Sequence, residues 1–175
     1  MDIIVSRNGT GKIGNFIFKC CLGIRGVTDD KSEGDLKTPR GTFPLRYIMY
    51  RKDKIKKLKV NLSIYSINKN HICCEDPDNI NYNKICIKKE MNETESLWRK
   101  DSSYDIIIII GYNDQPVQKG KGSAIFIHLA TNKYKPTKGC VALQLKDMKK
   151  LLSYNLKNIK IIFIPGDKLS VPEEL

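Results

Sequence analysis

Residues 126–143 read FIHLATNKYKPTKGCVAL. The stretch begins with an apolar run of aromatic and β-branched residues, which predicts a buried strand that reaches His128. A loop with Pro136 and Gly139 follows and leads to Cys140, and the chain then becomes apolar again. The pattern therefore predicts a histidine at the end of a strand and a cysteine after a loop, immediately before a helix.

A cysteine in that position is suited to nucleophilic catalysis. The N-terminus of the following helix and Lys138 would both favour the thiolate of Cys140, and His128 is a candidate to take its proton. Gly139 would let the backbone approach a substrate closely, and the N–H groups around Gly139 and Cys140 are candidate donors to a developing oxyanion. Most cysteines are inert core residues, so this spacing alone does not establish an enzyme.

The remaining apolar pattern predicts a mainly β, single-domain fold, a sandwich or barrel-like structure with about seven strands and one helix. The five isoleucines 106–110 predict a central strand that is buried on both faces. An amphipathic helix is predicted over 145–156. The other expectations are a hairpin in 2–22 with its turn at Asn8-Gly9-Thr10-Gly11, a long surface loop in 23–41, and strands at 43–49, 123–129 and 159–164.

We expect one domain over residues 1–167 of the 175-residue chain. This domain carries an irregular insertion at about 75–103, with a short helix near 93–98. A C-terminal tail at 168–175 follows the domain. The sequence does not decide whether this insertion acts as a lid. The basic run 51–59 is interpreted as a solvated loop.

The chain is strongly basic, with 31 lysine and arginine residues against 19 aspartate and glutamate residues and a net charge of +12. Nucleic acid, an anionic membrane surface or a carboxylate-bearing polymer would suit this charge, which is equally explained by a composition rich in lysine, isoleucine and asparagine. The rival to an enzyme is therefore a basic binding module that uses 51–59, Lys119, Lys121 and the lysines of the helix. No interleaved stacking aromatics and no helix-turn-helix, RRM or zinc-finger pattern support it, and no apolar run is long enough for a transmembrane helix.

Six cysteines are present, and we expect most of them to be reduced, buried thiols. Four of them form the adjacent pairs Cys20-Cys21 and Cys73-Cys74, and no CxxC motif occurs. With two histidines and no paired-ligand spacing, no metal site is predicted. His71, near Cys73 and Cys74, lacks the glycine-bearing turn that follows His128, so it is interpreted as structural.

Two separated segments resemble the YkuD family of L,D-transpeptidases. The first is His128 followed by Thr137-Lys138-Gly139-Cys140-Val141, similar to the family's His, then Ser or Thr, a variable residue, Gly, Cys and a hydrophobic residue. The second is Thr38-Pro-Arg-Gly-Thr-Phe43, similar to a Thr-Pro-x-Gly-x-Phe segment of the family. With weaker likeness at 98–99, 104–114 and 120–129, the resemblance covers about residues 2–165. The loop between His128 and Cys140 is shorter than is usual in the family, and Lys138 stands where many members have histidine.

The resemblance implies an L,D-transpeptidase fold and a cysteine acyl-transfer enzyme that needs no metal or organic cofactor. Cys140 would attack the L,D bond between the diamino acid and D-Ala of a peptidoglycan tetrapeptide or soluble muropeptide. His128 would be its general base and acid, with a backbone carbonyl orienting the other ring nitrogen. The resemblance also implies substrate contacts for Thr137, Lys138, Asn113 and Arg40. For Thr137 the alternative is a residue that only shapes the turn, and for Lys138 it is a solvated loop lysine.

The acceptor for the acyl group is left open. An amine of a second stem peptide would give a 3-3 cross-link or an exchanged D-amino acid, and water would give an L,D-carboxypeptidase. The N-terminus shows no basic and apolar export pattern. We therefore expect a cytoplasmic protein acting with water on recycled muropeptides if Met1 is the native start, and a periplasmic one if a signal has been removed. Oligomeric state and the identity of the diamino acid are not predicted.

Overall fold

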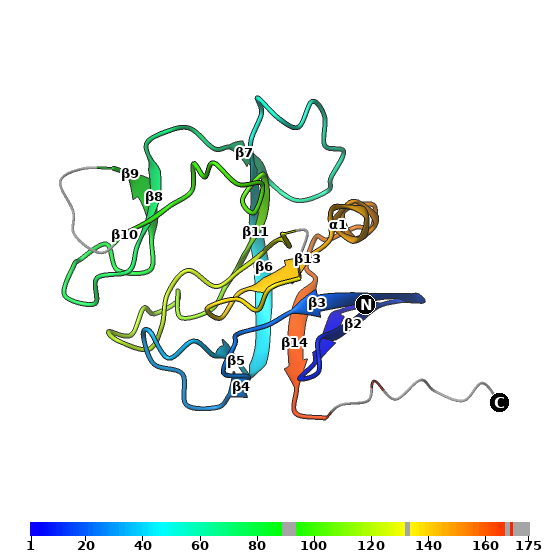
Figure 1. Ribbon diagram of the computed structural model, residues 1–175, viewed down its shortest axis with the longest axis horizontal. Helices are drawn as coiled ribbons and strands as arrows, with labels where there is room; N and C mark the ends of the chain where they lie inside the picture. The colour runs from blue at the N-terminus through cyan, green and yellow to red at the C-terminus, as the bar shows by residue number, and fades with distance from the viewer. Residues whose placement is uncertain (89–93, 132–133, 167–168, 170–175) are drawn as a thin grey trace.

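The computed structural model describes residues 1–88, 94–131, 134–166 and 169 (Figure 1). In that part of the chain the elements are, in order, β1 (Ile3–Ser6), β2 (Thr10–Ile13), β3 (Phe16–Cys21), β4 (Val27–Thr28), β5 (Thr38–Pro39), β6 (Gly41–Tyr50), β7 (Ile64–Ser66), β8 (His71–Cys74), β9 (Ile85–Ile87), β10 (Thr94–Ser96), β11 (Ile106–Ile110), β12 (Phe126–Leu129), β13 (Val141–Leu143), α1 (Leu145–Leu152) and β14 (Lys160–Ile164). The mainly β prediction with one helix after Cys140 is confirmed. None of the described helices is long and apolar enough to cross a membrane.

The main sheet closes on itself. Its nine strands run in the order β11-β12-β13-β3-β2-β1-β14-β6-β7, and β11 also pairs with β6. This extra pairing joins the two sides of the sheet into a barrel and leaves β7 outside the ring, on β6. Closure supplies hydrogen-bond partners to strands that would otherwise form exposed edges.

The isoleucines of β11 serve two cores, as their predicted burial on both faces requires. Ile106, Ile108 and Ile110 pack in the first core, which also contains Met148 of α1. Ile107 points the other way into a second core, together with Cys140. Alternate residues of a strand face opposite sides, so one uninterrupted apolar run can support both cores.

The second core is covered by a small sheet made of β8, β9 and β10, which lies on the side of the barrel away from α1 in Figure 1. The irregular insertion predicted at 75–103 is therefore partly regular, and the helix predicted near 93–98 is wrong. Residues Thr94–Ser96 form β10 and pair antiparallel with β8, and residue 93 lies outside the described residues. The conformation of this short segment is determined by its pairing with β8 rather than by its local propensity.

Several predicted boundaries also differ. Thr10 and Gly11 belong to β2 rather than to a turn, and the loop at 23–41 contains the paired strands β4 and β5. The strand predicted at 123–129 begins only at 126, because Ala124 adopts a positive φ of 54°. The helix ends at 152 rather than 156, and more strands form than the seven or so predicted. The tail predicted at 168–175 lies, except for residue 169, outside the described residues.

Candidate active site

The register of two neighbouring strands places His128 and Cys140 on the same face of the barrel. β12 and β13 are parallel, and His128 lies opposite Ala142. Cys140 precedes Ala142 by two residues, so its side chain points to the same side as that of Ala142. This is the side of the second core, which includes Phe126 as well as Cys140. The two residues that the sequence pairs are therefore brought together by one strand pair.

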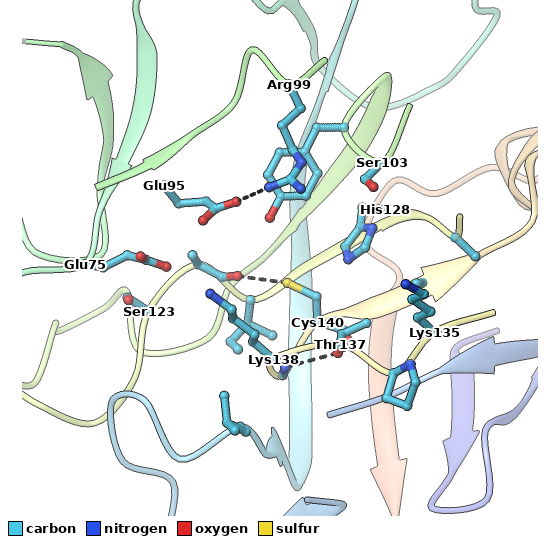
Figure 2. Close-up of a pocket in the computed structure, with 18 of the residues that line it drawn as sticks. Glu75, Glu95, Arg99, Ser103, Ser123, His128, Lys135, Thr137, Lys138 and Cys140 are labelled. Atoms are coloured by element: carbon cyan, nitrogen blue, oxygen red, sulfur yellow. Dashed lines mark hydrogen bonds and ion pairs between the residues drawn. The ribbon is translucent and has the colours of Figure 1, made fainter. Parts of the chain in front are cut away.

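Both side chains line a cavity of about 460 Å³ (Figure 2). Thr137, Lys138 and Gly139 line it as well, so five of the seven predicted site residues share one pocket. In Figure 2 Cys140 lies between His128 and Lys135 on one side and the carboxylates of Glu75 and Glu95 on the other.

The imidazole of His128 is oriented by the backbone. Its Nδ1 lies 2.9 Å from the carbonyl oxygen of Leu129, which accepts the Nδ1–H and leaves Nε2 as the basic nitrogen. Burial lowers the pKa of His128, so the ring is neutral at pH 7. The ring of Tyr104 meets it edge-on at a centroid distance of 5.3 Å. His128 is thus held in the form that a general base requires.

Cys140 is only 8% exposed, and the environment of its thiol opposes ionisation. Burial raises its pKa to about 12, and the charges of Glu95 and Glu75 raise it further, while a hydrogen bond from the backbone N–H of Phe126 and the charge of Lys31 lower it. The Sγ–H donates to the carbonyl oxygen of Ala124 at 3.0 Å. The site therefore holds a neutral thiol beside a neutral imidazole.

The predicted stabilisation of the thiolate by a helix N-terminus is wrong. Strand β13 intervenes between Cys140 and α1, whose N-cap is Gln144. The electrostatic effect of a helix N-terminus extends only about one turn from the helix end. Cys140 precedes β13 and packs in the second core, so it is not at the N-terminus of α1. The cation that lowers the pKa of Cys140 is Lys31, from the loop at 23–41, rather than Lys138.

Thr137 and Gly139 shape the turn that delivers the cysteine. The Thr137 hydroxyl donates to the carbonyl oxygen of Cys140 at 2.7 Å and accepts the N–H of Gly139 at 3.1 Å. The Gly139 N–H is therefore directed at Thr137, so its predicted role as an oxyanion donor is not supported by this geometry. Gly139 has a φ of 144°, and a Cβ there would lie 2.8 Å from the carbonyl oxygen of Lys37, so only glycine fits.

The two segments that carry the family resemblance meet behind this turn. Thr38 is fully buried, and its hydroxyl donates to the carbonyl oxygen of Gly139 at 2.9 Å while accepting the N–H of Gly23 at 2.9 Å. A single side chain thus connects the loop at 23–41 to the residue before the cysteine. The Thr-Pro segment therefore stabilises the turn at 137–140, which we call the cysteine turn.

This geometry agrees with a match to a known family. The sequence model of YkuD, the L,D-transpeptidase catalytic domain, matches residues 4–164. The chain belongs to the YkuD family. The matched range contains residues 128 and 137–141 and all of the closed sheet except Ile3.

Solved structures with a similar fold include the helical cell shape determining protein Pgp2 from Campylobacter jejuni, at 17% identity and a TM-score of 0.49, covering 95% of this chain and 48% of Pgp2. Bd1075 of Bdellovibrio bacteriovorus is similar at 14% identity and a TM-score of 0.45, covering 94% of this chain and 47% of Bd1075. The chain spans about half the length of these proteins. No curated protein sequence matches it.

Two of the substrate-binding residues expected from the YkuD resemblance do not line the pocket. Arg40 is partly exposed and forms an ion pair with Asp29 at 2.8 Å. The Asn113 amide donates to the carbonyl oxygens of Gln118 and Gly122, at 3.0 and 2.8 Å, and so closes a loop. Lys138 lines the pocket with an exposed side chain. His71 accepts the N–H of Asn68 at 3.0 Å and is not among the lining residues.

The other wall of the pocket was not predicted. It contains Glu75 and Glu95 from the small sheet and Arg99, which pairs with Glu95 at 2.8 Å and with Asp101 at 2.7 Å. Tyr104 also lines the cavity. Glu75 and Glu95 lie on short segments without a motif, and the packing of the small sheet brings them to the pocket. Arg99 and Tyr104 lie in the segments of weaker family likeness, which do not indicate their place in the pocket.

None of the six cysteines forms a disulfide in the structure, and four of them are buried: Cys20, Cys73, Cys74 and Cys140. Among residues 1–88, 94–131, 134–166 and 169, no group of three or more histidine, cysteine, aspartate or glutamate side chains is arranged to hold a metal ion.

Proposed function

We propose that this protein is a cysteine acyl-transfer enzyme that cleaves the L,D bond between the diamino acid and the terminal D-Ala of peptidoglycan tetrapeptides. The observation that carries the proposal is that Cys140 and a backbone-oriented His128 face one cavity in a chain of the YkuD family. Polar side chains of both signs line this cavity, which suits a peptide with amino and carboxylate groups.

In the first half-reaction, Cys140 Sγ attacks the carbonyl carbon of the third stem residue as His128 Nε2 takes the thiol proton. The tetrahedral intermediate then expels D-Ala: its C–N bond breaks, His128 returns the proton to the leaving amine, and a thioester remains on Cys140. Both groups start neutral, so the proton moves as the new bond forms rather than before it.

In the second half-reaction an acceptor attacks the thioester, gives its proton to His128 and restores the thiol. Water produces a tripeptide, the L,D-carboxypeptidase outcome in muropeptide recycling. An amine of a second stem produces a 3-3 cross-link, the transpeptidase outcome. The acceptor present where the protein acts selects between the two, and either outcome uses the same first half-reaction.

The test is incubation of the purified protein with a disaccharide-tetrapeptide, followed by mass spectrometry. We expect loss of D-Ala to give tripeptide or a cross-linked dimer, and the tripeptide-to-dimer ratio identifies the acceptor. The Cys140→Ala variant should be inactive. Cys86→Ala is the matched control, because Cys86 is a half-buried cysteine of β9 that does not line the pocket, and it should retain activity.

Absence of turnover with the wild-type protein, on several soluble muropeptides, would contradict the proposal. The basic binding module would then be the better explanation of the +12 charge. Its signature is retention on DNA that falls steeply with salt and is the same for wild type and Cys140→Ala.

A further inference from the structure

The carbonyl oxygen that accepts the hydrogen bond of the Cys140 thiol belongs to Ala124, a residue with an uncommon backbone conformation. Ala124 lies in the loop at 111–125, between β11 and β12, and has a φ of 54°. This left-handed conformation is uncommon for alanine and persists only where the surroundings impose it. It directs the Ala124 carbonyl oxygen to Cys140 Sγ at 3.0 Å. The orientation of the thiol therefore depends on whatever holds Ala124.

The side chain of Asn83, from the turn between β8 and β9, holds it. Asn83 Oδ1 accepts the N–H of Ala124 at 3.0 Å. Its Nδ2 donates to the carbonyl oxygens of Tyr112 and Asn113, at 3.0 and 2.7 Å. One amide thus connects the first residues of the loop to its last ones. Since Asn113 also bonds to Gly122, both ends of the loop are fixed relative to each other.

The residue before Asn83 secures the same turn. Tyr82 is 3% exposed, its hydroxyl donates to Glu33, and it accepts the N–H of Gly122 at 3.0 Å. The hydroxyl of Ser123 donates to the same Glu33 carboxylate at 2.7 Å. These bonds fix the Asn83 backbone independently of its side chain, so removal of the amide should leave the turn in place.

We propose that Asn83 is a positioning residue that orients the Cys140 thiol through Ala124 and so sets its reactivity. The proposal rests on the proposed function only in taking Cys140 as the nucleophile. A hydrogen bond from the neutral thiol disfavours the thiolate. By holding the acceptor, Asn83 keeps the proton on sulfur and fixes the position of Sγ in the pocket, which attack on a substrate requires.

The test uses Asn83→Gly, because glycine tolerates the φ of 57° at this position and removes only the amide. Cys140 alkylation by iodoacetamide is followed between about pH 7 and pH 10, for each cysteine separately, by peptide mass spectrometry. We expect the Cys140 profile to move to lower pH, with alkylation roughly threefold to tenfold faster at a given pH. The buried Cys20 is the internal reference and should be unchanged. In the muropeptide assay kcat should fall roughly tenfold while KM stays within about twofold.

The control is Asn158→Gly, the same substitution at an exposed asparagine with a φ of 63° in the turn before β14. It should leave both cysteines unchanged. The proposal is overturned if Cys140 alkylation in Asn83→Gly matches wild type, if Cys20 accelerates equally, or if Asn158→Gly has the same effect. Alkylation requires no substrate, so a failure of the proposed function would appear as absent turnover and would leave this measurement intact.

Discussion

At the scale of single residues, burial shifts the pKa values of Cys140 and His128 in opposite directions. It raises the pKa of the Cys140 thiol and lowers the pKa of the His128 imidazole, because desolvation disfavours the charged form of each. An ion pair of thiolate and imidazolium would carry two desolvated charges in the second core. In the mechanism proposed above, proton transfer from Cys140 to His128 therefore accompanies attack on the substrate.

The carboxylates of the pocket provide a direct test of this electrostatic balance. The charge of Glu95 raises the pKa of Cys140, so Glu95→Gln should lower it. Since the thiolate is the reactive form, Cys140 alkylation in this variant should be roughly threefold to tenfold faster at any pH below the thiol pKa. The pH profile should keep its shape and move to lower pH, as measured by iodoacetamide labelling.

Asp78→Asn is the matched control for that experiment. It also removes one carboxylate, but Asp78 is exposed, pairs with Lys119 at the surface and does not line the pocket. Surface charges are screened by solvent and salt, so the Cys140 profile should stay where it is. An unchanged profile in Glu95→Gln, or an equal shift in both variants, would contradict the proposed electrostatic effect.

At the scale of elements, strands buried on both faces are predictable from the sequence. Strands β11 and β12 are mostly apolar runs whose alternate residues face the two sides of the barrel wall, and such a run is visible in the sequence. Strand β14 instead alternates fully buried Ile161 and Phe163 with residues that are exposed or half-buried. Strands β8, β9 and β10 have only three or four residues each, and the residues of β10 are all polar. Their conformation comes from their partners, which is why the sequence suggests an irregular insertion with a helix.

The support of the cysteine turn by the loop at 23–41 leads to a prediction at this scale. Thr38→Val keeps the side-chain shape but leaves the Gly23 N–H and the Gly139 carbonyl without their shared hydroxyl. We expect a loss of about 1–3 kcal/mol in the free energy of unfolding, because the lost bonds are fully buried. Urea unfolding measures the loss, and the muropeptide assay should show a reduced kcat because Gly139 is no longer fixed.

Thr28→Val is the corresponding control. The Thr28 hydroxyl accepts the exposed N–H of Asp30 at 3.1 Å, a donor that water can satisfy. Stability should change by less than about 0.5 kcal/mol, with kcat unaltered. Equal losses in the two variants would show that the threonines matter for strand packing alone and that Thr38 has no special link to the turn.

At the scale of the whole molecule, the protein has two hydrophobic cores, and only one of them contains Cys140. The first core joins α1 to the strands, whereas the second contains Cys140 and is closed by the small sheet. The sequence predicts His128, Cys140 and the turn between them because these form a local motif. It does not predict Glu75, Glu95 or Asn83, because the path of the insertion over the second core depends on packing between segments far apart in the chain.

This division predicts that equivalent cavities in the two cores have different consequences. Leu97 and Leu151 are both fully buried, the first in the second core and the second in the first. Each change to alanine should lower the free energy of unfolding by about 2–5 kcal/mol. Only Leu97→Ala should also lower kcat and speed Cys140 alkylation, since it loosens the packing around the thiol. The comparison is made at a temperature where circular dichroism shows both variants folded, and an equal effect of Leu151→Ala on Cys140 would show that the two cores act as one.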